Sequence, residues 1–252
     1  MSLPTAVPPA TVPSAARPAF RAVPLTERCH RVYARRIHAC IGISPFNGYF
    51  HAQRIAELAH WAIAEFEQVH FFVPDSLAVH TLQAIGYPPD RAAFKARRQG
   101  QYVLNKIATA LAALGVPDPA ERLLTSAALP ANPRYAALHQ LARQLIATDP
   151  EFRAACLDAG AWVLDRRLPP GTAATQAQLL TASDYLIGEL PLFLDTPGIT
   201  GAAQSVFCYH QAPRFLRLLF THRLACAPQP TQGFLQVLPV DAAGPNSAAQ
   251  PS

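Results

Sequence analysis

The pattern of apolar and polar positions predicts alternating strands and helices from residue 37 onward. Residues 37–43 form an uninterrupted, mainly apolar run, which is typical of a strand buried on both faces. From 52 to 68 the apolar residues recur at helical spacing, and 69–73 is a second short β-prone run. A strand–helix–strand order implies a parallel sheet with crossover helices, so the chain is expected to be an α/β protein.

Further elements follow the same logic downstream. The segment Pro74-Asp75-Ser76 predicts a turn and a helix cap. Helices are predicted over 91–114, 134–147, 151–165, 175–190 (ending near Pro191) and from 213 to 220, with a strand over 205–209.

Composition places limits on the folded part of the chain. Half of the 252 residues are hydrophobic, enough for a large core. Residues 1–26 and 226–252 are rich in Pro and Ala and are expected to be disordered tails, which leaves 27–225 as one folded domain. No apolar run is long enough to span a membrane, and no signal-peptide pattern opens the chain.

The five cysteines show no CxxC spacing, which argues against a metal site or a redox dithiol. Scattered cysteines of this kind fit buried thiols in a reducing cytoplasm, which is the expected location.

Positive charge is concentrated in the first part of the chain. Residues 1–106 carry twelve Lys or Arg against six Asp or Glu, whereas the rest is close to balanced. The predicted helix 91–114 contains no acidic residue and places Arg91, Lys95 and Arg98 on one face. Such a face either contacts a polyanion such as nucleic acid or is simply solvated.

Ser44 follows the first predicted strand at once, where an α/β sheet binds its ligands. Gly42-Ile43-Ser44 resembles the start of a G-x-S-x-G nucleophile elbow, but Phe46 stands where that motif has its last glycine. The serine is therefore either a nucleophile or a helix cap.

Two polar groups fall in apolar surroundings further along the chain. Tyr185 and Glu189 are four residues apart and share a helix face. A buried carboxylate there needs a cation, either a substrate ammonium group or an arginine, and Gly188 leaves room for a ligand. Tyr209 and His210 follow the strand 205–208 at its ligand end, or else the tyrosine packs in the core and the histidine caps a helix.

Taken together, three blocks resemble the cyclodipeptide synthase family. The blocks are Gly42-Ile43-Ser44-Pro45-Phe46-Asn47-Gly48-Tyr49-Phe50, Tyr185-Leu186-Ile187-Gly188-Glu189-Leu190-Pro191 and Val206-Phe207-Cys208-Tyr209-His210-Gln211. The match spans most of 30–220, and Asn47 with Tyr209 and His210 corresponds to the Asn-Tyr-His subgroup.

The resemblance implies a single Rossmann-like domain, with a parallel sheet and helices on both faces, similar to class I aminoacyl-tRNA synthetases. It implies an enzyme that joins two aminoacyl-tRNAs into a cyclic dipeptide, without ATP or a cofactor, and that is monomeric. Consistent with this, we find neither a HIGH-like nor a KMSKS-like signature.

By the same resemblance, Ser44 is the nucleophile, Tyr185 and Glu189 bind the amino group, and Tyr209 orients Ser44 or stabilises the oxyanion. Supporting roles fall to Gly42, Asn47, His210 and Tyr135. The family's basic helix implies tRNA contacts from Arg91, Lys95, Arg97, Arg98 and Lys106. Expected walls of an apolar pocket for the first amino acid are Cys40, Gly42, Phe72, Pro74, Leu192 and Phe207.

Two other functions fit the sequence. An α/β serine hydrolase would use Ser44, Asp184 or Asp195, and His210 in that order. A non-catalytic tRNA-binding module on a synthetase-like fold would keep the basic helix and use Ser44 as a cap.

Overall fold

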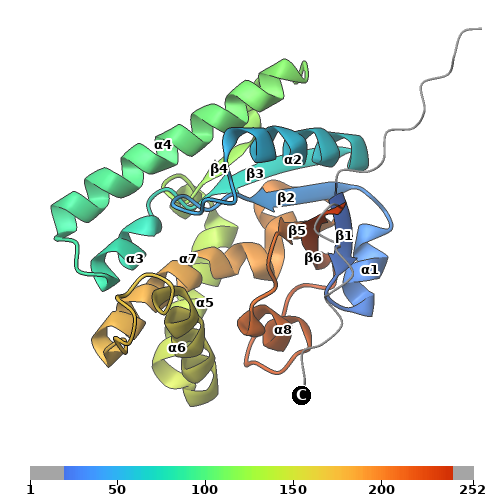
Figure 1. Cartoon of the computed structure of the whole chain (residues 1–252). Coiled ribbons are helices and arrows are strands. Elements are labelled where there is room, and N and C mark those ends of the chain that lie inside the picture. Colours follow the sequence, from blue (N-terminus) through green and yellow to red (C-terminus); the bar gives the residue numbers. More distant parts are fainter. Residues whose placement is uncertain (1–19, 241–252) are drawn as a thin grey trace, which may run out of the picture.

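One six-stranded sheet forms the centre of the molecule (Figure 1). The computed structural model describes residues 20–240. The strand order is β1-β6-β5-β2-β3-β4, and every neighbouring pair is parallel except β1 with β6. The strands are β1 (Phe20–Pro24), β2 (His38–Gly42), β3 (Gln68–Val73), β4 (Leu123–Thr125), β5 (Ser205–Tyr209) and β6 (Gln232–Pro239).

Helices cover both faces of this sheet. Those that pack on one face, α2 and α4, lie above it in Figure 1, and α5 to α8 lie below. The helices are α1 (Glu27–Tyr33), α2 (Ala52–Glu65), α3 (Ala78–Ala84), α4 (Pro89–Ala113), α5 (Pro133–Thr148), α6 (Pro150–Leu164), α7 (Gln176–Thr200) and α8 (Arg214–Phe220), with short 3-10 turns η1 (Pro119–Arg122) and η2 (Leu129–Ala131). The predicted α/β class, with a parallel sheet between two helical layers, is confirmed.

The topology positions the candidate site. From β2 the chain continues outward to β3 and β4, whereas β5 and β6 lie on the other side of β2. The order therefore reverses between β2 and β5, which makes the gap between these two strands the topological switch point of the sheet. Open α/β sheets bind ligands at this point, beside the carboxyl ends of the strands. Gly42 ends β2 and Tyr209 ends β5 there.

The predicted limits of the folded domain, 27–225, are too narrow. Strands β1 and β6 lie outside them, pair with each other and complete the sheet. Phe20 and most of β6 are buried, because their apolar side chains cover the same two cores as the central strands. The remainder of the two predicted tails, 1–19 and 241–252, lies outside the described residues.

Helix α7 does not end near Pro191 as predicted. It continues to Thr200, and its only non-helical backbone lies at Asp195. The Asp195 carboxylate accepts a hydrogen bond from the Gly198 N–H at 2.9 Å, and Pro197 occupies the first turn of the next segment, where a missing N–H costs nothing. Burial of nearly every residue from Leu190 to Pro197 outweighs the missing hydrogen bond at Pro191.

The turn at Pro74-Asp75-Ser76 is present, but it does not cap a helix. Helix α3 begins at Ala78 without a side-chain cap. Asp75 instead accepts hydrogen bonds from the Ser126 hydroxyl at 2.8 Å and the Ala127 N–H at 3.1 Å. These bonds tie the end of β3 to the segment that follows β4. Among the helices of residues 20–240, none is long and apolar enough to cross a membrane.

Candidate active site

The loop after β2 presents Ser44 to the switch point. Gly42 is required there because a Cβ at this position would lie 2.9 Å from the Phe207 ring. Phe46 adopts a φ of 61°, the left-handed conformation that a glycine takes most easily. The loop thus makes a sharp turn despite lacking the glycine of the elbow motif. Ser44 is no helix cap, since His51 caps α2.

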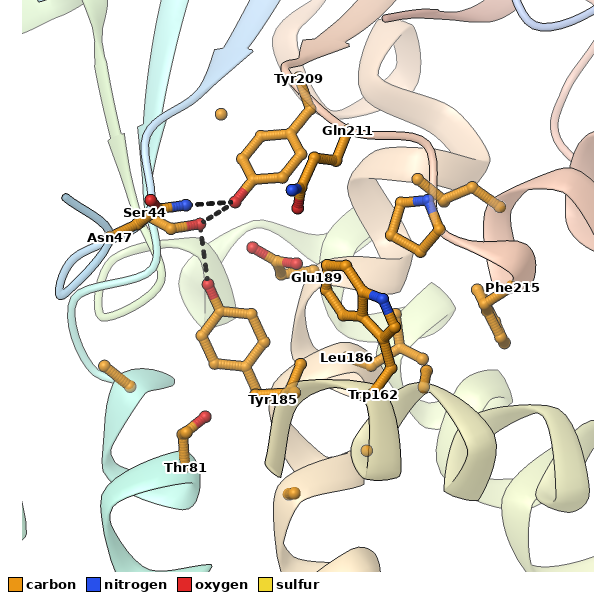
Figure 2. A pocket seen from close by; sticks show the side chains of 18 of the residues that line it. Ser44, Asn47, Thr81, Trp162, Tyr185, Leu186, Glu189, Tyr209, Gln211 and Phe215 are labelled. Carbon is orange, nitrogen blue, oxygen red and sulfur yellow. Dashed lines mark hydrogen bonds between the residues drawn. The ribbon is translucent and has the colours of Figure 1, made fainter. Parts of the chain in front are cut away.

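The Ser44 hydroxyl lies between two phenols (Figure 2). Its Oγ is 2.9 Å from Tyr209 Oη, at the end of β5, and 3.4 Å from Tyr185 Oη, on α7. The Asn47 amide nitrogen is 3.5 Å from Tyr209 Oη and 3.5 Å from His210 Nε2. The tertiary structure therefore brings together four residues of the three sequence blocks around Ser44.

Burial keeps both phenols protonated. It raises the pKa of Tyr209 to about 12. It raises the pKa of Tyr185 well above its ordinary range, and nearby Glu189 adds to this effect. Both groups therefore act near neutral pH as hydroxyl donors and acceptors toward Ser44, and neither is a phenolate base.

Glu189 lies one helical turn beyond Tyr185 and faces the same cavity (Figure 2). No ion pair within residues 20–240 involves it. The alternative of a partner arginine is therefore wrong. Burial raises the pKa of Glu189 to about 8, although the Tyr185 hydroxyl acts in the opposite direction. The free site thus holds a mostly neutral carboxyl group near pH 7, which an arriving ammonium group would ionise.

Gly188 and Tyr135 hold α7 in place. A Cβ on Gly188 would lie 2.2 Å from Leu77 Cδ2, so this glycine permits close packing of α7 on the segment that enters α3. The expectation that it leaves room for a ligand is therefore wrong. Tyr135 donates a hydrogen bond to the Gly188 carbonyl at 2.8 Å, which supports the backbone next to Glu189.

A cavity of about 480 Å³ surrounds these groups. Of the expected apolar walls, Gly42 and Phe207 line it. The others, Cys40, Phe72, Pro74 and Leu192, are buried and do not line this cavity. Cys40, Phe72 and Leu192 pack into the core on the face of the sheet that α5 to α8 cover. Their places in the sequence do not show how far the cavity reaches.

Several residues that line the cavity were missed by sequence reasoning. They are Trp162, Arg166 and Arg167 at the end of α6 and the following turn, Gln211 after the Tyr-His pair, and Phe215 on α8. The Arg166 guanidinium lies 4.0 Å from the centre of the Trp162 ring. In Figure 2, Trp162 and Phe215 lie on the far side of Glu189 from Ser44. A tryptophan followed by two arginines at a helix end was the signal that could have indicated them.

The hydrolase arrangement is wrong. Ser44 has its hydrogen bonds with the two tyrosines, while His210 Nε2 faces Asn47. Asp195 is paired with Arg134 at 2.7 Å, and Asp184 lies 3.9 Å from His80. No described histidine–aspartate pair therefore serves Ser44 as a base.

The basic side chains predicted on one helix lie on α4, which Figure 1 shows at the outer edge of the molecule, and no residue of α4 lines the cavity. The side chains of Arg91, Lys95, Arg97 and Arg98 are exposed, and Lys106 is half-buried. Lys95 donates a hydrogen bond to Tyr87 Oη at 2.8 Å, and Arg98 to Tyr102 Oη at 3.3 Å. Within the described residues, none of the five is paired with a carboxylate, so their charge remains free to attract an anion.

A serine hydroxyl between two phenols, beside a carboxyl group and at the switch point of a Rossmann-like sheet, suits covalent acyl transfer. Residues 20–239 match the family model described as cyclodipeptide synthase. The chain is 32% identical to the cyclo(L-tyrosyl-L-tyrosyl) synthase of Mycobacterium tuberculosis, over 89% of this chain and 78% of that protein. It is 31% identical to the cyclo(L-leucyl-L-leucyl) synthase of Bacillus subtilis, over 86% and 89% respectively. The chain therefore belongs to the cyclodipeptide synthase family.

Solved structures agree with this assignment. A cyclodipeptide synthase from Bacillus thermoamylovorans superposes with a TM-score of 0.83 at 26% identity, over 88% of this chain and 97% of that one. A Mycobacterium tuberculosis protein, whose structure relates cyclodipeptide synthetases to type I tRNA synthetases, gives a TM-score of 0.78 at 31% identity, over 89% and 95%. The expected likeness to class I synthetase domains is thus confirmed.

Proposed function

We propose that this protein makes a cyclic dipeptide from two aminoacyl-tRNAs by covalent catalysis through Ser44. The observation that carries the proposal is the position of Ser44 Oγ, 2.9 Å from Tyr209 Oη and 3.4 Å from Tyr185 Oη, inside a cavity that also holds Glu189.

In the first step, Ser44 Oγ attacks the carbonyl carbon of the aminoacyl ester. The bond from that carbon to the ribose oxygen breaks, and the serine proton passes to the ribose oxygen, directly or through the Tyr209 hydroxyl. The ester arrives already activated, so ATP is not consumed. Tyr209 and Tyr185 are neutral donors that can stabilise the negative charge developing on oxygen.

In the second step, the tethered amino acid must present a neutral amine. Its ammonium group lies against Glu189 and Tyr185, and the carboxylate of Glu189 takes the proton. The amine attacks the carbonyl carbon of the second aminoacyl ester, the bond from that carbon to the ribose oxygen breaks, and the ribose oxygen of the departing second tRNA takes the proton that the nitrogen loses. The terminal amine of the dipeptide then attacks the ester at Ser44, which closes the ring and restores the serine hydroxyl.

The basic face of α4 supplies phosphate contacts for the first tRNA. Phosphate contacts position a nucleic acid without reading its sequence, and the cations of α4 lack carboxylate partners among the described residues. Arg166 and Arg167, exposed where they line the cavity, suit the phosphates near the aminoacylated end of a tRNA.

The test is mass spectrometry of culture medium from bacteria that express the wild type or Ser44→Ala. We expect diketopiperazine masses from the wild type alone, and an aminoacyl adduct on Ser44 in the purified wild type. Thr81→Ala, which removes another hydroxyl lining the cavity, is the matched control and should retain product. Soluble wild type without product, together with intact tRNA binding, would favour the binding module. Product from Ser44→Ala would exclude covalent catalysis through this serine.

A further inference from the structure

The side-chain rings of Tyr49 and Phe50, in the loop after β2, pack together with the ring of His210, which follows β5. The Tyr49 ring stacks on the His210 imidazole, with centroids 4.2 Å apart and planes 10° apart. Phe50 meets both rings edge-on, at 5.0 and 5.2 Å. The mechanism proposed above uses neither Tyr49 nor Phe50, although both rings pack on His210 and the Phe50 ring also lies 5.8 Å from the Tyr209 ring.

The orientation of Asn47 is fixed by the backbone. Its Oδ1 accepts a hydrogen bond from the Tyr49 N–H at 3.0 Å, so its Nδ2 faces Tyr209 and His210. An amide nitrogen only donates, and His210 Nε2 must therefore accept. Burial lowers the pKa of His210 to about 4. The ring is thus neutral near pH 7 and carries its single proton on Nδ1.

That proton has no acceptor among the described residues. His210 Nδ1 and Tyr49 Oη are both buried polar atoms without a hydrogen-bond partner. Both residues also line one small cavity of about 10 Å³, whose other walls are mainly apolar side chains of β2, α2, β5 and β6. That volume is about the smallest that holds a water molecule, and buried polar groups are rarely left unsatisfied.

We propose that one water molecule occupies this cavity and joins His210 Nδ1 to Tyr49 Oη, which makes Tyr49 a positioning residue for Ser44. The water accepts a hydrogen bond from His210 Nδ1–H, so the proton stays on Nδ1 and the lone pair of Nε2 stays free to accept from Asn47. Asn47 in turn donates to Tyr209, which contacts Ser44. Tyr49 thereby acts through His210, Asn47 and Tyr209, and the inference rests on the proposed function of Ser44.

Tyr49→Phe tests this proposal because it removes the hydroxyl and keeps the stacked ring. Tyr33→Phe is the matched control, since its hydroxyl bonds to Glu65 away from the site. A high-resolution crystal structure of the full chain should show the water in the wild type and not in Tyr49→Phe. Nitrogen NMR of His210 should show the Nδ1-protonated tautomer in the wild type. The rate of Ser44 acylation should fall about fivefold in Tyr49→Phe, the effect of one neutral hydrogen bond, with tRNA affinity unchanged.

Three results would overturn the proposal: an empty cavity in the wild type, an Nε2-protonated His210, or a Tyr49→Phe variant that is less stable but acylates Ser44 at the wild-type rate. The water and the tautomer are measured without turnover. A wild type that is never acylated would therefore refute the function of Ser44 separately from the hydrogen-bond chain.

Discussion

At the scale of single residues, the site depends on how burial sets protonation. Glu189 sits in a cavity formed mostly by apolar and neutral groups, and its pKa is raised to about 8. The two phenols beside Ser44 have raised pKa values for the same reason. The site thus keeps neutral groups around Ser44, and Glu189 loses its proton to solvent when an ammonium group arrives beside it.

Glu189→Gln should separate the two acyl transfers. Glutamine cannot take a proton from the tethered ammonium group, whereas Ser44 keeps both of its phenol contacts. We expect the aminoacyl-enzyme to accumulate, while dipeptide formation falls by roughly a hundredfold or more, as for loss of a general base. Intact-protein mass spectrometry after rapid mixing with aminoacyl-tRNA measures the amount of aminoacyl-enzyme. Mass spectrometry of the released product measures dipeptide formation. Equal loss of both steps would place Glu189 in the first transfer as well.

Protonation of Glu189 should also be visible in stability. Because the folded-state pKa is raised above the ordinary value of 4.5, the carboxyl group binds its proton more tightly in the folded chain than in the unfolded chain. Wild-type stability relative to Glu189→Gln is therefore highest below about pH 4.5, falls as the pH rises toward about 8, and is constant above that. Thermal unfolding of both proteins from pH 4 to pH 9 measures the difference. A difference that does not change with pH would contradict the raised pKa.

At the scale of elements, the proposed function gives α7 and α4 separate tasks. Helix α7 brings Tyr185 and Glu189 to the cavity and depends on close contact with the segment that enters α3. Helix α4 buries one stripe against the sheet and leaves its charged side chains in solvent. Catalysis and RNA contact are therefore expected to respond to different substitutions.

Gly188→Ala should destabilise the protein even though alanine is the better helix former. The new methyl group would overlap the Leu77 side chain, and overpacking typically costs about 1–3 kcal/mol. Denaturant unfolding should show that loss, and the double variant Gly188→Ala with Leu77→Ala should show positive coupling between the two sites. An increase in stability, of the size expected from helix propensity alone, would mean that the contact is loose.

Removing charge from α4 should weaken tRNA binding and its dependence on salt. For Arg91→Ala with Lys95→Ala and Arg98→Ala, the slope of log affinity against log salt should become shallower by about one unit for each phosphate that the helix no longer neutralises. Titration of aminoacyl-tRNA at several salt concentrations gives the slope. A control that replaces the exposed Arg31, Arg217 and Arg223 removes the same charge elsewhere. A control with an equal effect would indicate attraction by net charge instead of a binding face.

At the scale of the whole molecule, the sheet needs both its first and its last strand. Strand β1 adds to β6, and β6 completes the sheet beside β5, next to the strand end that holds Tyr209. Phe20 on β1 is buried and lies 6.0 Å from the Trp61 ring on α2. These two strands therefore contribute to the same core as β2 and β5, whose ends carry the candidate site.

Phe20→Ala should show this directly. Loss of a buried phenylalanine typically costs about 3–5 kcal/mol, whereas Phe94→Ala, at a position that is 58% exposed, should change stability by less than about 0.5 kcal/mol. Chemical denaturation of the two variants checks the contrast. If Phe20→Ala and Phe94→Ala had equal free energies of unfolding, β1 would be only loosely packed on the domain.

Much of the fold and of the site was predictable from local patterns. The apolar run 37–43 predicted β2 to within one residue at each end, and the helical spacing in 52–68 predicted the start of α2 and overshot its end by three residues, because strand and helix periods are local properties. The three sequence blocks indicated the family and the residues that meet around Ser44. Strands β1 and β6 were missed because the prolines around them suggested disorder and outweighed short apolar alternations.

The sequence by itself determined the α/β class, the order of the central strands and helices, and which side chains could serve acyl transfer. Only the tertiary structure decided which of them meet. The cavity extends from Ser44 toward Trp162 and Phe215 and not into the core around Phe72, Gly188 faces Leu77, and His210 faces Asn47 instead of Ser44. These outcomes depend on packing between segments far apart in the chain, and local periodicity carries no information about such contacts.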